Sequence, residues 1–169
     1  QTANATFIEV VINPISATIQ VAENTSFRCD ADAGGKKSTG ELYYGRVRAK
    51  VKKLASGSSY RISSPSLVAG VRGTDFGCDV VSAPVPKDAA SGTGASPVIN
   101  RVFCFEGSVI VTDAAQAVSD SVVIGGNEMV EKVVDKEGSV VVGVPAKAKL
   151  PEEVKNFWSD HPVSPVAVK

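Results

Sequence analysis

The chain has 169 residues, with 18 basic and 18 acidic side chains, and its size suits a single domain that folds without metals or disulfides. This charge balance removes the electrostatic attraction on which nucleic-acid binding depends, so we expect no nucleic-acid partner. No apolar run reaches the ~20 residues of a membrane-spanning helix, so no transmembrane segment is predicted.

The first residue is Gln1, and the only methionine is Met129. We therefore expect that a leader was removed or that the sequence is a fragment.

Short strands separated by turns are predicted along most of the chain, because apolar and β-branched residues recur there with a period of two. In chain order, the predicted strand segments are 6–12, 17–21, 26–30, 41–54, 59–63, 66–81, 101–111, 122–134 and 137–143. Polar residues 84–97 are typical of a low-complexity connector. Segments 106–111 and 137–142 share a glycine turn that leads into a new strand.

The C-terminal region is predicted to be helical over 150–160. Pro151 is followed by two acids, which the first turn of a helix favours. The apolar residues of this segment, Leu150, Val154, Phe157 and Trp158, fall on one helical face. We therefore expect an all-β domain over 1–149, an antiparallel β-sandwich or roll of the jelly-roll or short solenoid-like type. One short C-terminal helix packs on it, and 161–169 form a flexible tail.

A row of cations is predicted on one face of the strand over 41–54. The side chains of Arg46, Arg48, Lys50 and Lys52 share that face because strand residues alternate, and Tyr44 extends it. Like charges in register repel, so cross-strand acids, solvent or an anionic partner must compensate them. A solvated face that discourages edge aggregation is one interpretation. A surface for an anionic glycan, lipid headgroup or protein is the other.

Residues 30–41 resemble a calcium loop in spacing, with acids or hydroxyls at Asp30, Asp32, Ser38 and Glu41 and a glycine at position six. The fifth position is also glycine, and Lys36 and Lys37 bring opposing charge. We therefore predict an ordinary hairpin loop and no metal or other cofactor.

The three cysteines show no metal-ligand spacing. Cys78 and Cys104 are predicted to point inward from consecutive antiparallel strands, where they form either a disulfide in an oxidising compartment or two small buried apolar groups. Cys29 is expected to be buried or free.

Arg72 lies between Gly70 and Gly73 in a stretch that otherwise reads as buried strand. Glycines allow a bulge or a close backbone approach, which a side chain would prevent. Two interpretations are open: Arg72 and Thr74 bind an anion, or the Arg72 guanidinium ties neighbouring loops together through internal hydrogen bonds. We favour the internal tie, since a charged group beside a bulge is usually satisfied within the protein.

Two motifs resemble the signature of FecR-type domains. The first is Val71-Arg72-Gly73-Thr74 followed, after one residue, by Phe76, and the second is Phe105-Glu106-Gly107-Ser108-Val109. Gly45-Arg46-Val47 and the stretch from Ile19 to Phe27 also occur in the family's order, so the resemblance covers about 17–135. It implies an extracytoplasmic bacterial domain with an all-β fold, whose namesake reports the state of an outer-membrane iron–citrate transporter to a sigma factor.

A non-catalytic binding or signal-reading module of a bacterial envelope protein, periplasmic or otherwise extracytoplasmic, is therefore the predicted function. No nucleophile elbow, phosphate-binding loop or paired metal ligands occur, so no enzyme is predicted. The alternatives are a structural scaffold or spacer in a larger envelope protein and, more distantly, an iron-uptake regulatory sensor domain. The sensor would require a transmembrane segment outside this sequence.

Overall fold

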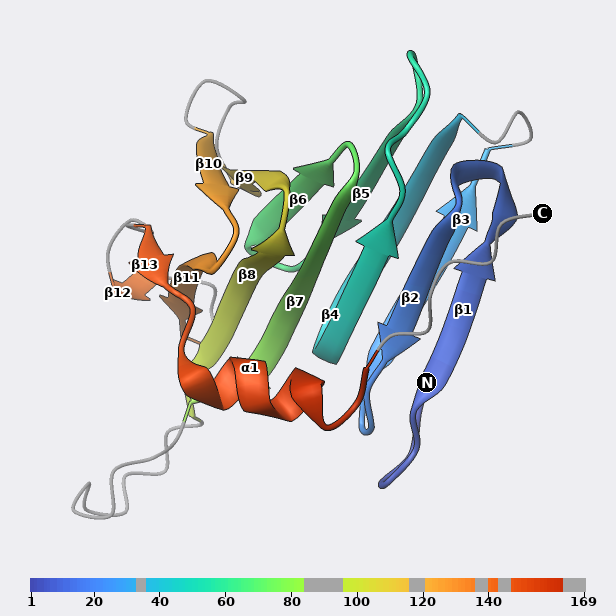
Figure 1. Cartoon of the computed structure of the whole chain (residues 1–169). Coiled ribbons are helices and arrows are strands. Elements are labelled where there is room, and N and C mark those ends of the chain that lie inside the picture. The colour runs from blue at the N-terminus through green and yellow to red at the C-terminus, as the bar shows by residue number, and fades with distance from the viewer. Residues whose placement is uncertain (33–35, 84–95, 116–120, 136–139, 143–146, 163–169) are drawn as a thin grey trace, which may run out of the picture.

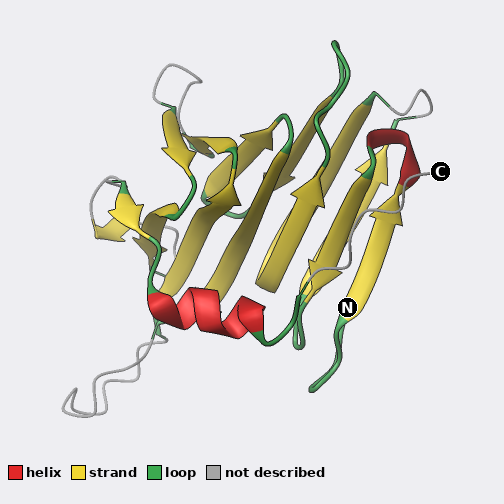
Figure 2. Ribbon diagram, in the orientation of Figure 1, coloured by secondary structure: helices red, strands yellow, loops and turns green. Residues whose placement is uncertain are grey.

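The computed structural model describes residues 1–32, 36–83, 96–115, 121–135, 140–142 and 147–162. The strands are β1 Ile8–Ile12, β2 Ala17–Val21, β3 Ser26–Ala31, β4 Lys37–Val51, β5 Ser59–Ser63, β6 Leu67–Val71, β7 Thr74–Ser82, β8 Val98–Glu106, β9 Ser108–Asp113, β10 Val122–Gly125, β11 Glu128–Val134, β12 Val140–Val142 and β13 Ala148–Lys149. A short 3-10 turn, Asn13–Ile15, joins β1 to β2, and helix α1 spans Glu152–Ser159. The prediction of an all-β fold with one short C-terminal helix is confirmed (Figures 1 and 2).

The strands form one curled sheet, which we divide into two layers. The helix-covered layer comprises β1, β2, the second half of β4, β7, β8, β11, β12 and β13. The open layer comprises β3, the first half of β4, β5, β6, β9 and β10. Every pairing is antiparallel except that of β4 with β5, which is parallel. Strand β4 belongs to both layers and holds them together.

The main hydrophobic core lies between the two layers. Alternation along each strand sends one side chain in two inward, as with Val47 and Ala49 on β4, which are fully buried. The ring of Tyr60 from the open layer meets the ring of Phe76 from the helix-covered layer edge-on, with centroids 6.4 Å apart. The curl of the sheet therefore produces the double-layer packing of a sandwich.

The chain changes layers six times, and a residue with positive φ lies at each change. These residues are Asn24 (51°) between β2 and β3, Gly45 (97°) within β4, Gly57 (82°) between β4 and β5, Gly73 (117°) between β6 and β7, Gly107 (90°) between β8 and β9, and Asn127 (63°) between β10 and β11. Glycine and asparagine are the residues that adopt this backbone conformation at least cost. The predicted segment 66–81 is therefore two strands in different layers.

Backbones approach closely at these corners. A Cβ on Gly73 would lie 2.8 Å from Lys53 Cα, and one on Gly107 would lie 2.9 Å from the Gly73 carbonyl oxygen. The Thr74 hydroxyl donates a hydrogen bond of 2.9 Å to the Ser108 carbonyl, which joins the two corners. We call residues 73–74 and 107–108 the corner seam.

Helix α1 lies across the outer face of the helix-covered layer (Figure 1). Leu150, Val154 and Trp158 are buried there against Phe103 and Met129, in a second apolar cluster. Gly77 makes room for this cluster, because a Cβ at that position would lie 2.4 Å from the Phe103 ring.

The residues after α1 turn back toward the N-terminal segment. His161 stacks on Phe7, with ring centroids 3.9 Å apart, and its Nδ1 lies 3.0 Å from the Phe157 carbonyl oxygen. Most of the predicted connector and the end of the predicted tail, 84–95 and 163–169, lie outside the described residues.

Replacing Gly73 with alanine tests the corner seam. We expect Gly73→Ala to lower the free energy of unfolding by about 2–4 kcal/mol, because it adds backbone strain and a steric clash with Lys53. Gly57 is the matched control: its φ is also positive, at 82°, but a Cβ added there would have no neighbour within 4 Å. Urea unfolding of Gly57→Ala should therefore show only the smaller strain penalty. Equal losses in the two variants would contradict the role of close packing.

Candidate functional site

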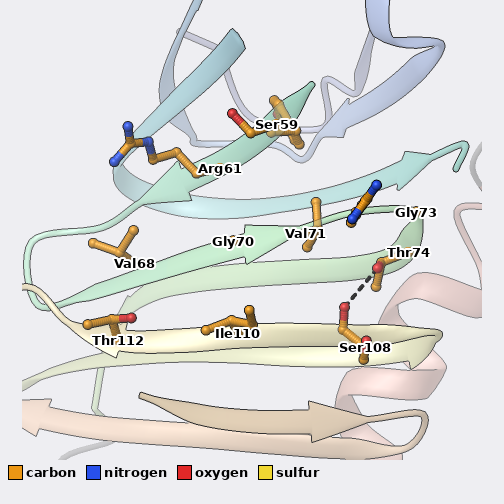
Figure 3. Close-up of a pocket in the computed structure, with 12 residues that line it drawn as sticks. Ser59, Arg61, Val68, Gly70, Val71, Gly73, Thr74, Ser108, Ile110 and Thr112 are labelled. Carbon is orange, nitrogen blue, oxygen red and sulfur yellow. Dashed lines mark hydrogen bonds between the residues drawn. The ribbon is translucent and has the colours of Figure 1, made fainter. Parts of the chain in front are cut away.

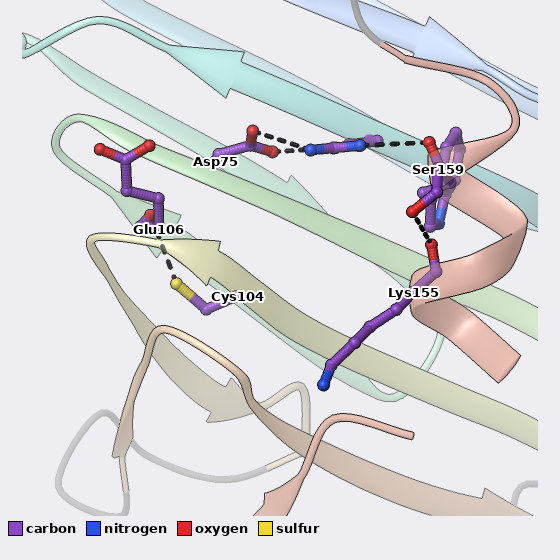
Figure 4. A network of polar contacts seen from close by, with 7 residues as sticks. Asp75, Cys104, Glu106, Lys155 and Ser159 are labelled. Atoms are coloured by element: carbon purple, nitrogen blue, oxygen red, sulfur yellow. Dashed lines mark hydrogen bonds and ion pairs between the residues drawn. The ribbon is translucent and has the colours of Figure 1, made fainter. Parts of the chain in front are cut away.

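Two members of the predicted row of cations, Arg46 and Arg48, contact α1. The charged members of the row, Arg46, Arg48, Lys50 and Lys52, are all partly buried, whereas Tyr44 is exposed. Arg48 donates two hydrogen bonds of 2.9 Å, one to each carboxylate oxygen of Asp75 on β7, and a third of 3.4 Å to the Trp158 carbonyl (Figure 4). Its guanidinium carbon also lies 4.1 Å from the centre of the Phe105 ring. A cross-strand acid thus compensates Arg48, one of the possibilities that the sequence left open.

A second line of charges crosses four strands in register. In the strand register, Arg46 lies opposite Asp79, Asp79 lies opposite Arg101, and Arg101 lies opposite Glu131. The sign of the side-chain charge therefore alternates from β4 to β11. Arg101 forms an ion pair of 2.5 Å with Glu131. Arg46 places its guanidinium carbon 4.4 Å from the centre of the Phe157 ring of α1. Alternating charges in adjacent cross-strand positions attract, so this line stabilises the sheet order.

Asp79 is the least satisfied member of this line. It is fully buried, and neither carboxylate oxygen has a hydrogen-bond partner among the described residues. Burial raises the pKa of Asp79 from 3.8 to about 6, while Arg46 and Arg101 oppose the rise and Glu153 of α1 adds to it. This carboxyl therefore changes charge in mildly acidic solution.

Two of the four cations of the predicted anionic-partner surface, Arg46 and Arg48, are thus engaged in internal contacts. The surface formed by Tyr44 and 46–52 stays a prediction, and Lys50 and Lys52 are its charged members for which the described residues show no such partner.

The two signature motifs meet at the corner seam. Val71, Thr74 and Phe76 are buried, and Gly107 packs on the Gly73 carbonyl, whereas Glu106 is exposed. Arg72 is exposed at the bend between β6 and β7, and it makes no hydrogen bond or ion pair with any residue in the described part of the chain. The internal tie that we expected from Arg72 is therefore wrong: the tie is made by Gly73, Thr74 and their counterparts after β8, while the guanidinium points to solvent.

An open groove lies on the outer face of β5, β6 and β9, beside Arg72 (Figure 3). Its volume is about 490 Å³. The lining residues are Ser59, Tyr60, Arg61, Val68, Gly70, Val71, Arg72, Gly73, Thr74, Ser108, Ile110 and Thr112. They include two arginines and no carboxylate. We refer to this feature as the arginine groove.

Sequence reasoning missed Arg61 as a groove residue. The register places Arg61 opposite Gly70 on β6, and Gly70 opposite Ile110 on β9, so three distant segments form one row. The alternation in 59–63 predicts that Arg61 points away from the core. Its neighbours could not be predicted because β5 pairs parallel with β4 and β6 pairs with the much later β9.

The three cysteines are free thiols. Cys78 and Cys104 both belong to the main core, as predicted, but the register pairs Cys78 with Val102 and Cys104 with Phe76. The two cysteines are thus diagonal neighbours, whose Cα atoms are roughly 7–8 Å apart in antiparallel sheets. That separation exceeds the usual disulfide range, so the disulfide alternative is not formed in this structure.

The segment with calcium-loop spacing, residues 30–41, belongs to a hairpin of β3 and β4 in its described part. Asp30 pairs with Arg28, and the Asp32 carboxylate accepts a 2.9 Å hydrogen bond from the Lys37 amide. Within the described ranges, no group of three or more histidine, cysteine, aspartate or glutamate side chains could hold a metal ion. No described helix is long and apolar enough to cross a membrane.

Comparison with known proteins gives a family and a fold. The family model described as FecR protein matches residues 1–109. Two crystal structures of a proposed anti-sigma factor from Parabacteroides distasonis are similar over 95% of this chain, with TM-scores of 0.64 and 0.65 and 14% sequence identity. The chain spans 63% and 64% of the length of those neighbours. No curated protein matches the sequence.

The pair of Arg48 and Asp75 is open to a double-mutant test. Their side chains are 16% and 8% exposed, so removing either partner leaves a nearly buried charge uncompensated. We expect Arg48→Met or Asp75→Asn alone to lower the free energy of unfolding by about 3–5 kcal/mol, and the double variant to recover part of that loss. Arg28→Met, which breaks the exposed pair with Asp30, should leave the urea midpoint unchanged. Strict additivity of the two single changes would contradict a direct interaction.

Asp79 predicts a pH dependence of stability. Because its pKa is higher in the folded state, about 6 against 3.8, the folded state binds the proton more tightly. The stabilising contribution, about 3 kcal/mol, is complete below the unfolded pKa and lost as the pH rises through the folded pKa. We expect the difference in unfolding free energy between Asp79→Asn and the wild type to grow in favour of the variant from pH 4 to pH 7. A constant difference across that range would contradict the assignment.

Proposed function

Because this chain belongs to the FecR protein family, we propose that it is the extracytoplasmic, non-catalytic part of a regulator that reads a signal by binding another protein. The family is regulatory and envelope-associated. The single observation that carries the binding role is the contrast between the two outer faces of the sheet. Helix α1 and its aromatic residues cover one face, whereas the arginine groove lies open on the other.

The open layer carries the features of a protein contact surface. Ile110 on β9 is 52% exposed, and Val123, its partner on β10, is 53% exposed. Apolar side chains beside exposed arginines are typical of protein interfaces, which are enriched in arginine and poor in acids at their centre. The groove lining holds no carboxylate, in keeping with that composition.

The structural neighbours suggest where such a module would act. The Parabacteroides protein is described as a proposed anti-sigma factor, and this chain spans less than two thirds of it. We propose that this chain likewise forms the signal-reading part of a longer regulator whose other segments control transcription. Tyr44, Lys50 and Lys52 of the predicted anionic-partner surface are a second proposed contact, away from the groove.

Site-specific photocross-linking in the native host tests the binding role. A photoreactive phenylalanine analogue at Ile110 or Val123 should yield covalent adducts with an envelope protein. Val11 on β1 is the matched control, since its exposure is also 53% but it lies in the helix-covered layer. A phosphatase fusion that is active only outside the cytoplasm should show activity in the same strain.

Two outcomes would overturn the proposal. An inactive phosphatase fusion would place the module in the cytoplasm. A lack of adducts from both Ile110 and Val123 would indicate the scaffold or spacer alternative instead, because a spacer presents no partner to the open layer.

A further inference from the structure

The arginine groove contains two guanidinium groups that no acid in the described part of the chain neutralises. Neither Arg61 nor Arg72 has a hydrogen bond or ion pair to the described residues, and no acid lines the groove. Arg28, an exposed arginine on strand β3 of the same layer, differs in this respect because Asp30 pairs with it at 2.8 Å. The groove is therefore complementary in charge to an anionic ligand.

The spacing of the two arginines matches an extended chain. Arg61 lies opposite Gly70, and Arg72 follows Gly70 by two residues, in the bend directly after β6, so the two arginines are in diagonal positions across β5 and β6. Such positions are roughly 7–8 Å apart. Alternate side chains of an extended peptide are separated by about 7 Å. Two acids with one residue between them would therefore have the same spacing along the peptide as the two arginine positions.

The rest of the groove fits a peptide better than a small anion. A Cβ on Gly70 would have a single neighbour within 4 Å, the Ile110 carbonyl oxygen at 3.9 Å, so a ligand backbone can pass close to the sheet there. Val68 lies two residues before Gly70 on β6, on the side opposite Arg72, and Ile110 lies beside Gly70. These side chains offer an apolar contact that an inorganic anion would leave exposed to water.

We propose that the arginine groove binds an acidic segment of the partner protein in extended conformation, with the pattern acid-x-acid-x-apolar. The two carboxylates face Arg72 and Arg61, and the apolar side chain packs on Val68 and Ile110. This inference rests on the proposed function, since it names the part of the partner that the open layer recognises. It also assigns a role to the exposed arginine of the signature motif.

Three synthetic peptides test the pattern with the whole chain. The matching probe is Ac-Glu-Ser-Glu-Ser-Val-NH2, the neutral control replaces both glutamates with glutamine, and the spacing control is Ac-Glu-Glu-Ser-Ser-Val-NH2. In ¹H–¹⁵N NMR titrations at low salt, we expect the matching probe to bind at least tenfold more tightly than the neutral control and severalfold more tightly than the spacing control. Binding should weaken as salt is added.

Variants of the exposed arginines locate the binding. Arg61→Ala and Arg72→Ala should each weaken binding of the matching probe about fivefold and together by more than tenfold. Arg28→Ala, the matched control on the same layer, should change it by less than twofold. All three positions are exposed, so thermal unfolding should show that each variant stays folded.

Several results would overturn the inference. The matching probe could fail to bind at all, or the neutral control could bind as tightly as the probe. The double variant Arg61→Ala/Arg72→Ala could bind the probe as tightly as the wild type does, or inorganic phosphate could bind as tightly as the probe. If any of these occurred while Ile110 still gave envelope adducts, the proposed function would stand and the acidic segment alone would be rejected. If the probe bound as expected but no adducts formed, the proposed function would fail instead.

Discussion

The fold depends on a seam where the chain turns between layers with no side chain to separate the backbones. Gly73 packs against Lys53, Gly107 packs against Gly73, and a Cβ on Gly126 would lie 3.1 Å from the Phe105 carbonyl oxygen. Each of these glycines thus packs against backbone atoms of a residue earlier in the chain. The positive φ of Gly73 and Gly107 and the narrow space exclude larger residues for two independent reasons. Because both motifs supply this seam, their short pattern specifies a long-range contact.

The outer face of the helix-covered layer meets a different constraint. The charged side chains of this layer are buried or partly buried, and α1 covers part of the layer. They are Arg48, Asp75, Asp79 and Arg101, and each loses water that would otherwise solvate its charge. Mutual pairing and aromatic rings compensate most of these charges. Asp79 is the exception, and its raised pKa reflects the incomplete compensation. Arg46 and Arg48 therefore supply the polar contacts between this layer and α1, while Trp158 and Val154 supply the apolar contact.

The alternation of apolar residues predicted the strands and the helix well, because these elements depend mainly on residues that are close in the sequence. Alternation gave β2 and β5 with their observed bounds, and the apolar spacing of Leu150, Val154 and Trp158 placed the helix face. The sequence could not separate β6 from β7, since only Arg72 and Gly73 lie between the two strands. It also could not show that Arg46 and Arg48 of β4 contact α1, because Arg48 and Trp158 are 110 residues apart. The groove could not be predicted for the same reason. Arg61, Gly70 and Ile110 lie side by side only because β5, β6 and β9, which are separate in the sequence, pair with one another.

The signature motif separates into structural and exposed positions. Val71 and Thr74 point inward or into the seam, and Gly73 makes the corner itself, so changes at these positions act on the fold. Arg72 alternates with them and points outward beside the groove. The Arg72 guanidinium has no hydrogen bond or ion pair with the described residues, so the polar contacts of the seam do not account for it. The corner that requires glycine at 73 also brings the end of β6 against β9, and it thereby sets Arg72 at the rim of a surface where a partner can reach it.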